Sequence, residues 1–327
     1  MTYIVTGGLG YLGFALVNDL LRRSNEQIIV IDSESPGEFF HRNPRIKVHQ
    51  GDISDREFLG SIQLPSDTKG AFHLAAKKSV SESLLKPNEY MKVNLEGTKN
   101  ILDFCQENGV ENFVFTSSAA VYRGIEDLPS IDESSDLDPS SPYGVSKLMA
   151  ENEIKNFSQV HGLRSAILRV FNIGGSIGGW TPIKPEENLI PILIHCILTD
   201  QAFTVFGQDL QTKDGSCERD FIHVSDVSDA HIKAMKKLEG DNTQDCKIYN
   251  ICSGNGSSVF EILNLLEEAS GEVVQRILQP IRVGEYQKVI GNNENAKQDL
   301  GWSIEKTLQD IVMDSWNNRG SKASIIS

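Results

Sequence analysis

Tyr143 and Lys147 lie four residues apart in the stretch SPYGVSKLMAE, directly after Pro142. Proline suits the first turn of a helix, and residues four apart on a helix share one face, so the phenol and the ammonium can converge. A tyrosine beside a positive charge can act as a base, because that charge stabilises the phenolate. The spacing alone is a weak signal, since a chain of this composition can contain it by chance.

For tyrosine to act as a base at neutral pH, its pKa must be lowered. Free tyrosine has a pKa of about 10, and lowering it to about 7 requires about 4 kcal/mol of extra stabilisation of the phenolate. One positive charge about 4 Å away supplies about 4 kcal/mol at an effective dielectric constant of about 20. We therefore predict that Lys147 lowers the pKa of Tyr143, and that a bound cationic ring would add to the effect.

The elements that must position the pair alternate along the chain. Apolar, β-branched segments alternate with segments of helical period, which predicts an α/β fold with a doubly wound parallel sheet of the Rossmann type. Strands of such a sheet are buried on both faces, so they are almost wholly apolar. The predicted strands are YIVTG, QIIVID, IKVHQ, AFHLAA, NFVFTSS and SAILRV.

A second, smaller C-terminal α/β domain is predicted after Val170, where Gly and Pro become frequent and the elements become shorter and mixed. The segments RDFIHV and KIYNI still have the pattern of main-sheet strands, so we expect interleaved domains. The expected larger domain is 1–175 with 218–252, and the expected smaller domain is 176–217 with 253–327.

The stretch VTGGLGYLG follows the first predicted strand and opens a helix, with glycines at Gly7, Gly10 and Gly13. Such glycines permit a tight turn, let the backbone approach a pyrophosphate, and let helix and strand pack closely. Asp32 ends the next strand, where a carboxylate can bind the adenosine ribose hydroxyls. Because that carboxylate would repel a 2′-phosphate and Ser33 supplies no compensating charge, the predicted cofactor is NAD and not NADP.

Composition excludes several classes of protein. A formal charge of −14 disfavours binding to nucleic acid or an anionic membrane, so an anionic ligand would need local arginines. The five cysteines are scattered without a Cys-x-x-Cys, and no His-Glu-x-x-His is present, so no metal is expected. We expect His73 and His223 to be packed core residues. The longest apolar run, LIPILIHCIL, is too short to span a bilayer, and we expect a cytoplasmic protein.

The glycine spacing, GDI from Gly51, HLAA from His73, FTSSAAVY and SPYGVSK together resemble the extended short-chain dehydrogenase/reductase family. More narrowly, SVSES, LRVFN, NLIP, TKDGSCERDFIHVSD and LGW resemble the UDP-glucose 4-epimerases (UDP-galactose 4-epimerases). The resemblance covers nearly the whole chain, and it implies NAD-dependent inversion of carbon 4 of a UDP-hexose. It also implies a homodimer formed through helices that include Asn88 to Cys105 and Tyr143 to His161.

The resemblance also implies roles for individual residues. The implied catalytic residues are Ser118, Tyr143 and Lys147. The implied cofactor-binding residues are Gly7, Gly10, Tyr11, Leu12, Gly13, Asp32, Asp52, Ile53, Leu74, Ala75, Ala76, Lys78, Asn94, Tyr143, Lys147 and Phe171. The implied substrate-binding residues are Ser118, Tyr143, Asn172, Asn188, Leu189, Thr204, Val205, Phe206, Arg219, Arg282 and Glu285. Guanidinium groups suit a diphosphate, and the alternative for Arg219 and Arg282, as for Lys78 and Glu285, is a surface charge.

The chemistry implied for these residues is an oxidation that is later reversed. We expect Tyr143, assisted by Ser118, to remove the proton of the sugar 4-hydroxyl while hydride passes from carbon 4 to NAD. The 4-keto sugar turns over within the pocket, still held by its diphosphate. Hydride then returns to the opposite face and gives the epimer.

Two positions depart from the family pattern. Arg123 stands where the family usually has glycine. Val289 stands where many epimerases have a bulky tyrosine, although Tyr286 can take that place in another alignment. A smaller residue would widen the pocket, so N-acetylated UDP-sugars and UDP-glucuronate remain alternative substrates.

Two other functions are alternatives to epimerisation. A nucleotide-sugar 4,6-dehydratase shares the fold, NAD and the Tyr/Lys pair, but it normally has an acidic pair where this chain has SSAA. A non-catalytic, NAD-binding regulator on the same scaffold commonly lacks the Tyr/Lys pair, which this chain has.

Overall fold

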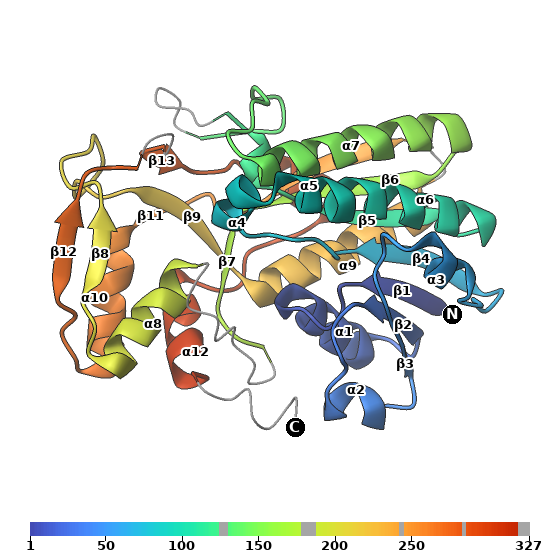
Figure 1. Cartoon of the computed structure of the whole chain (residues 1–327), viewed down its shortest axis with the longest axis horizontal. Coiled ribbons are helices and arrows are strands. Elements are labelled where there is room, and N and C mark those ends of the chain that lie inside the picture. Colours follow the sequence, from blue (N-terminus) through green and yellow to red (C-terminus); the bar gives the residue numbers. More distant parts are fainter. Residues whose placement is uncertain (124–129, 178–187, 242–244, 283–285, 320–327) are drawn as a thin grey trace.

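The computed structural model describes residues 1–123, 130–177, 188–241, 245–282 and 286–319. A larger unit is built on one central sheet, and a smaller unit of short strands and helices packs against one end of it (Figure 1).

The central sheet has seven parallel strands in the order β10-β6-β5-β4-β1-β2-β3. Its strands are β1 (Thr2–Thr6), β2 (Gln27–Asp32), β3 (Ile46–Gln50), β4 (Thr68–His73), β5 (Asn112–Ser118), β6 (Arg164–Val170) and β10 (Cys246–Ile251). This order confirms the predicted doubly wound sheet. Because the strands are parallel, the turns that follow β1, β4 and β5 lie at one edge, where such sheets bind ligands.

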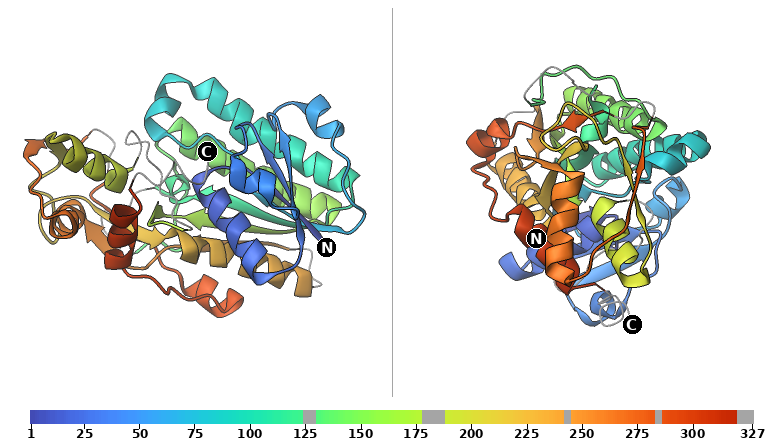
Figure 2. Two further views of the ribbon diagram at one scale, coloured as in Figure 1. Left: turned by 90° about the horizontal axis from the view of Figure 1, so that it is seen from below. Right: turned by 90° about the vertical axis from the view of Figure 1, so that its left-hand side faces the viewer.

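Helices cover both faces of this sheet (Figure 1). One face carries α1 (Tyr11–Arg23), α2 (Glu38–Arg42), α9 (Val224–Gly240) and α11 (Glu294–Leu300). The other face carries α3 (Arg56–Gly60), α4 (Val80–Leu85), α5 (Pro87–Tyr90), the π-helix η1 (Met91–Glu96), α6 (Gly97–Glu107) and α7 (Pro142–His161). The helices α1 and α9 lie side by side (Figure 2). Each face has its own buried apolar cluster, so both layers contribute to the core.

Helix α7 begins where the sequence predicts. The Ser141 hydroxyl accepts a hydrogen bond from the Gly144 amide at 3.1 Å, and Pro142 occupies the first turn. The helix ends at Gly162, whose φ of 72° is left-handed. A Cβ at Gly144 would lie 2.3 Å from the Ala120 carbonyl oxygen, so only glycine lets α7 pack this closely on the short 3₁₀ helix η2 (Ala119–Val121) after β5.

The smaller unit has its own core and two small sheets. Its strands are β7 (Asn172–Gly174), β8 (Phe203–Phe206), β9 (Glu218–His223), β11 (Gly256–Ser258), β12 (Arg276–Gln279) and β13 (Lys288–Val289). Its helices are α8 (Leu189–Thr199), α10 (Val259–Ser270) and α12 (Leu308–Asn317), which enclose one apolar cluster. The strands form a four-stranded sheet, in which β9 pairs with β7, β11 and β13, and a separate β8–β12 pair.

One strand prediction is wrong. RDFIHV was expected in the main sheet, but it forms β9 of the smaller sheet, and the following helix α9 packs on the main sheet. KIYNI is confirmed as main-sheet strand β10. Both segments are rich in apolar residues and largely buried. Such a pattern predicts that a strand is buried, but it does not predict which sheet the strand joins.

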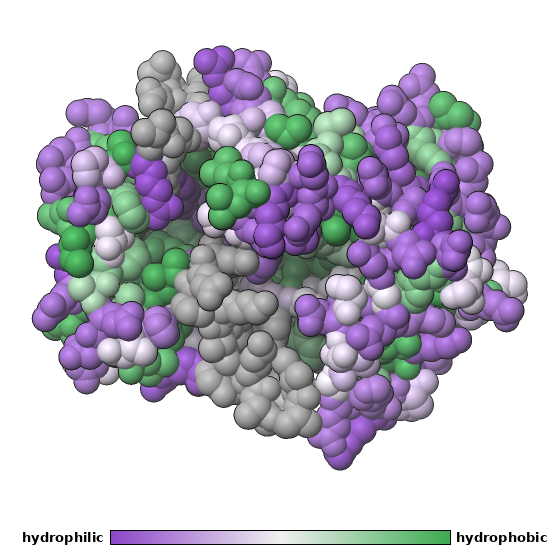
Figure 3. Space-filling view, viewed as in Figure 1, coloured by the Kyte–Doolittle hydropathy of each residue, from purple (hydrophilic) through white to green (hydrophobic). Residues whose placement is uncertain are grey.

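The described surface is largely hydrophilic on the face shown in Figure 3, with a group of hydrophobic residues over α4. Leu84 and Leu85 of that helix are 62% and 83% exposed. Among the described residues, no helix combines the length and the apolar character needed to cross a membrane.

Candidate active site

The glycine turn after β1 has the shape of a dinucleotide cradle. Gly7 has a φ of +70°, and a Cβ there would lie 2.7 Å from the Ala75 amide nitrogen. A Cβ at Gly13 would lie 2.0 Å from the Gly7 carbonyl oxygen. Gly10 is the N-cap of α1, so the free amides of the first helical turn face the place where a pyrophosphate would bind. The backbone conformation, and not only the residue type, therefore fits NAD.

Asp32 completes this half of the site. Its carboxylate accepts hydrogen bonds from the amides of Leu9 at 2.9 Å and Glu34 at 3.0 Å. Burial raises its pKa, while the backbone hydrogen bonds lower it. The side chain is thus held at the carboxyl end of β2 beside the glycine turn, where a ribose hydroxyl can donate to it.

The other predicted cofactor residues fall into three groups by exposure. Ile53, Asn94 and Phe171 are buried, whereas Asp52 and Lys78 are exposed. Leu74, Ala75, Ala76 and Leu12 are half-buried, and so is Tyr11, whose hydroxyl donates to the Gly175 carbonyl at 2.6 Å.

Asn94 is engaged with the protein itself. Its amide nitrogen donates to the Lys77 carbonyl and to the Ser146 hydroxyl, both at 2.9 Å, and its oxygen accepts from the Lys77 amide at 2.8 Å. Both of its N–H donors are therefore used, which favours a role in fixing the β4 turn against α7.

His73 is a fully buried core residue, as predicted. Thr98 donates its hydroxyl proton to the Asn94 carbonyl, so the Thr98 oxygen accepts from His73 Nε2 at 2.9 Å. His73 Nδ1 is then the acceptor for the Thr6 hydroxyl at 2.6 Å. Burial, and secondarily the charge of Lys147, lowers the pKa of His73 to about 3. This neutral ring fastens β4 to the first strand and to α6. His223 is buried too, and its Nε2 lies 3.2 Å from a carboxylate oxygen of Asp314.

The predicted catalytic residues come together at the carboxyl end of β5. Ser118 ends β5 and is hydrogen-bonded to Tyr143 in the first turn of α7. Lys147, one turn further along, is 3% exposed, and its Nζ lies 4.4 Å from the centre of the Phe115 ring. The ring of Tyr90 meets that of Tyr143 edge-on at 6.4 Å. The structure therefore brings all three residues together, with Lys147 buried and Ser118 and Tyr143 half-buried.

The predicted direction of the Tyr143 pKa is wrong for this arrangement of protein groups. Burial raises the pKa of Tyr143, and the hydrogen bond from Ser118 only partly lowers it. Burial also lowers the pKa of Lys147 to about 7, while the negative charge of Glu151 raises it. The cost of removing both groups from water outweighs their mutual attraction here.

A buried ion pair next to these residues was missed. Arg169 of β6 donates to both carboxylate oxygens of Glu151, at 3.0 and 2.7 Å, and the two side chains are 1% and 0% exposed. Arg169 also donates to the Tyr122 hydroxyl at 2.9 Å, and Tyr122 donates to Asn250 at 2.7 Å. Glu151 lies four residues beyond Lys147, so helical spacing alone would have marked it.

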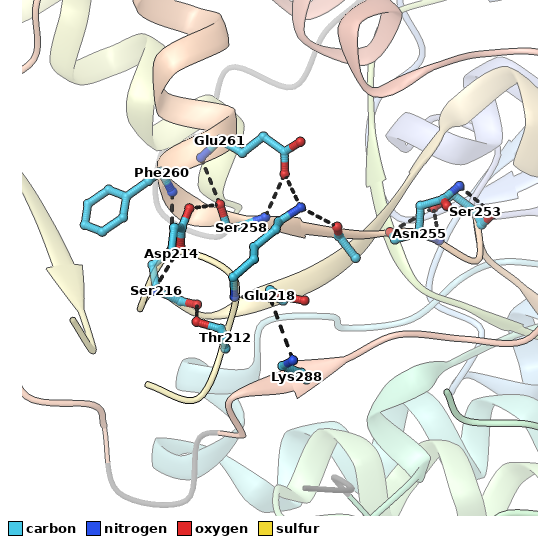
Figure 4. A network of polar contacts seen from close by, with 12 residues as sticks. Thr212, Asp214, Ser216, Glu218, Ser253, Asn255, Ser258, Phe260, Glu261 and Lys288 are labelled. Atoms are coloured by element: carbon cyan, nitrogen blue, oxygen red, sulfur yellow. Dashed lines mark hydrogen bonds and ion pairs between the residues drawn. The ribbon is translucent and has the colours of Figure 1, made fainter. Parts of the chain in front are cut away.

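On the substrate side, a polar network holds the loop before β9 (Figure 4). Asp214 accepts hydrogen bonds from Ser258 and, at 2.7 Å, from the Ser216 hydroxyl. Lys213 bonds Glu261 at 2.6 Å, and its amide donates to Glu218 at 2.8 Å. This network ties the start of β9 to the capped first turn of α10, and so it fixes the backbone next to Arg219.

The predicted substrate arginines lie on different elements of the smaller unit. Arg219 is half-buried on β9 and donates to the Glu218 carbonyl at 2.9 Å. Arg282 is exposed, and its guanidinium carbon lies 4.0 Å from the centre of the Phe206 ring. Phe206 is half-buried on β8, where Cys217 contacts its carbonyl oxygen at 3.8 Å, which links β8 to the start of β9.

The other predicted substrate-binding residues differ in their exposure. Thr204 is half-buried on β8, whereas Val205 is fully buried in the core of the smaller unit, so a contact from Val205 would come from its backbone. Asn172 and Asn188 are exposed, and Leu189 is half-buried at the start of α8. Glu285 lies outside the described residues.

Val289 and Arg123, which depart from the family pattern, both lie in the described part of the chain. Val289 pairs with Arg219 in the β9–β13 ladder and packs against the cluster that contains Phe171 and Tyr122. Arg123 is exposed directly after η2, and its amide donates to the Asp136 carbonyl at 3.0 Å. Val289 therefore forms part of the wall between the two units.

Comparisons with known proteins agree with this geometry. Residues 3–252 match the NAD dependent epimerase/dehydratase family. The UDP-glucose 4-epimerase of Lacticaseibacillus casei is 33% identical over 322 residues, which cover 97% of this chain and 96% of the relative. The structure of UDP-glucose 4-epimerase from Stenotrophomonas maltophila, with bound NAD and formylated UDP-arabinopyranose, is similar with a TM-score of 0.90, at 30% identity and 98% coverage of both chains. That from Bifidobacterium longum, in complex with NAD+ and UDP, has a TM-score of 0.88 at 28% identity and covers 98% of this chain and 99% of its own. This chain belongs to the NAD dependent epimerase/dehydratase family.

Proposed function

We propose that this chain is a UDP-glucose 4-epimerase, an NAD-dependent isomerase that inverts carbon 4 of a UDP-hexose through a transient 4-keto sugar. The observation that carries the proposal is the meeting of Ser118, Tyr143 and Lys147 at the same sheet edge as the glycine turn after β1. A base and a dinucleotide cradle are the two parts that a reversible alcohol oxidation needs.

Residues of the larger unit would hold NAD. The glycine turn with Gly7, Gly10 and Gly13 would bind the pyrophosphate, and Asp32 the adenosine ribose. When bound, NAD accepts hydride from the sugar carbon and gives it back. The residues of the β4 turn, Leu74 to Lys78, together with Asn94 and Phe171, would surround the rest of the cofactor.

Tyr143 would take the proton of the sugar 4-hydroxyl, and Ser118 would orient that hydroxyl through the hydrogen bond it shares with Tyr143. Lys147 would contribute its positive charge to the phenolate of Tyr143. Because Lys147 is buried and Tyr143 is half-buried, bulk water has little access to the proton.

The smaller unit would hold the nucleotide end of the substrate. We propose that Arg219 and Arg282 bind the diphosphate, and that Phe206 and Thr204 line the nucleotide site. A substrate anchored at one end leaves its hexose free to turn between the two hydride transfers. On this proposal the cofactor domain is the unit built on the seven-stranded sheet, and the substrate domain is the smaller unit with β7, β8, β9, β11, β12, β13, α8, α10 and α12.

A homodimer in the cytoplasm is proposed as the form of the protein. Val145 and Met149, one turn apart on α7, are 37% and 41% exposed, and such apolar side chains suit an isologous helix-to-helix contact. Helix α6 lies beside α7, with Lys99 3.1 Å from Glu153. The five cysteines, all free, suit a reducing compartment.

The test is to incubate the purified protein with UDP-galactose, without added reductant, and to follow the sugar by NMR. UDP-glucose should appear until the two sugars reach a constant ratio, and the Tyr143→Phe variant should form it at least about 100-fold more slowly. If the wild-type protein retains NAD but forms no UDP-glucose at any protein concentration, the proposal is wrong.

The comparisons favour UDP-glucose over the other substrates that the sequence left open. The same NMR experiment with UDP-N-acetylglucosamine and UDP-glucuronate separates them, since each would give its own carbon 4 epimer. A 4,6-dehydratase would instead release a 4-keto-6-deoxy sugar, and a regulator would change no sugar at all.

A further inference from the structure

Lys147 and Glu151 are enclosed together beneath α7. They lie four residues apart on one helix, which places them on one face, and their exposed fractions are 3% and 0%. The Lys147 ammonium rests over the Phe115 ring of β5 at 4.4 Å. Glu151 approaches the same strand, because Ser117 donates its hydroxyl proton to Glu151 Oε1 at 2.6 Å.

The Glu151 carboxylate is held rigidly from the sheet side. Arg169 Nε donates to Oε1 at 3.0 Å and Arg169 Nη2 donates to Oε2 at 2.7 Å, which is a two-pronged contact. With Ser117, three donors point at the two oxygens. A carboxylate fixed in this way cannot turn outward to solvent, so its charge stays under the helix.

We propose that Glu151 is a positioning residue of the epimerisation, whose buried carboxylate keeps Lys147 protonated while Tyr143 gives up its proton. The proposal rests on the proposed function, since it names what makes the base of that reaction work. Without a nearby anion, a buried ammonium loses its proton more readily, and the fraction of molecules that carry phenolate and ammonium together falls.

The charges that surround Lys147 support this role. Burial lowers the pKa of Lys147 to about 7, and the Glu151 charge raises it. From β4, His73 presents a neutral ring, because burial lowers its pKa to about 3. From β5, Phe115 presents only its ring. From α7 itself come Tyr143 and Glu151, so among these described neighbours Glu151 is the anion.

Two further cations act on Glu151. Arg169, from β6, is bonded to both carboxylate oxygens. Lys155, one turn further along α7, has its Nζ 3.9 Å from Glu151 Oε2 and is 34% exposed. Both pair with the carboxylate and help to hold it in place beneath α7.

The first experiment compares the NAD-bound wild-type protein with Glu151→Gln. Phenolate absorbance is measured against pH, with Tyr143→Phe as the background that isolates the signal of Tyr143. A fall of about one unit in the pKa of Lys147 corresponds to about a tenfold fall in the fraction that carries phenolate and ammonium together. We expect the phenolate signal near pH 8 and the kcat for UDP-galactose to fall by this factor together.

The shape of the kcat profile separates this role from a structural one. In Glu151→Gln, Lys147 loses its proton at a lower pH than in wild type, so the acid limb of the profile moves to lower pH while its height falls. A purely structural defect lowers the height and leaves the limb in place. An unmoved limb together with an undiminished phenolate signal would overturn the proposal.

A second variant guards against misfolding, because Glu151→Gln leaves Arg169 as an unpaired buried charge. Glu151→Gln/Arg169→Gln removes both charges, and it should restore stability towards urea while the phenolate signal stays low. A normal phenolate signal in this double variant would show that Glu151 serves only to pair Arg169, and would overturn the proposal. Glu153→Gln, on the same helix but 40% exposed and paired with Lys99, is the matched control and should behave as wild type.

The two proposals fail in different ways. If wild type converts no UDP-sugar, the proposed function fails, and the phenolate titration still reports on Glu151. If wild type is active and Glu151→Gln has an unchanged phenolate signal and profile, the inference about Glu151 fails alone.

Discussion

At the scale of single residues, burial controls the chemistry of Tyr143 and Lys147 as strongly as their mutual attraction does. Burial raises the pKa of Tyr143 and lowers that of Lys147 to about 7, so each group is pushed towards its neutral form. A reaction that needs phenolate and ammonium together must therefore draw on further charges. The fixed carboxylate of Glu151 is one of them, and the cationic ring of bound NAD is a second.

Removal of either member of the pair tests these roles directly. Tyr143→Phe and Lys147→Met should each lower kcat for UDP-galactose by about 10²- to 10⁴-fold, the usual contribution of a general base, with a much smaller change in KM. Tyr3→Phe is the matched control, because the Tyr3 hydroxyl donates to Glu239 at 2.6 Å on an unrelated part of the sheet. Steady-state kinetics at one pH suffice, and a near wild-type kcat in Tyr143→Phe contradicts its role as the base.

At the scale of elements, the glycine turn and α1 are shaped by backbone contacts that no side chain can replace. The Gly13 Cα faces the Gly7 carbonyl oxygen, so that helix and strand touch without any side chain between them. Helix α9 packs beside α1 and is fastened to β5 by His231, whose Nδ1 donates to the Val227 carbonyl at 2.8 Å. His231 Nε2 is then the acceptor for the Thr116 hydroxyl at 2.7 Å.

Gly13→Ala should weaken NAD retention. Its Cβ would lie 2.0 Å from the Gly7 oxygen, so the turn itself must shift, and overpacking of this kind typically costs about 1–3 kcal/mol. The bound cofactor is measured by absorbance after the purified protein is denatured. Gly60→Ala, where the added Cβ meets nothing within 4 Å, should retain NAD as wild type does. Equal retention in the two variants would mean that the turn does not hold the pyrophosphate.

His231 predicts a pH dependence of stability. Burial lowers its pKa from 6.5 to about 4, so the unfolded chain binds more protons between these values. Its contribution to stability is present above pH 6.5 and is lost as the pH falls towards 4. Between pH 7.5 and pH 5, the wild type should lose about 2 kcal/mol more of its unfolding free energy than His231→Gln, measured with urea. Parallel losses in the two proteins would refute a neutral, buried His231.

At the scale of the whole molecule, the proposed function places the hexose between the two units. The sequence predicted the parallel sheet, the glycine turn, Asp32 and the start of α7, because each depends on local pattern and spacing. It did not predict that RDFIHV joins the smaller sheet, or that Arg169 bonds Glu151, since both depend on which distant segments meet. The direction of the Tyr143 pKa also required the three-dimensional burial of the phenol.

The proposed dimer is tested on α7. Met149→Asp places a charge among exposed apolar side chains of the expected contact and should convert the protein to a monomer in light scattering at micromolar concentration. Val273→Asp, at a residue that is 83% exposed in the smaller unit, is the control and should leave the mass unchanged. A wild-type protein that is already monomeric would show that there is no dimer. A Met149→Asp variant that stays dimeric would show that the dimer contact lies outside this part of α7.

The most direct test of the central claim follows the hydrogen on carbon 4. Purified protein is given UDP-glucose that carries deuterium at carbon 4, with no cofactor added, and the UDP-galactose formed is examined by NMR. If the same hydride leaves and returns within one closed site, the deuterium stays on carbon 4 of the epimer. Loss of the deuterium to solvent, or the absence of any epimer, would contradict the account.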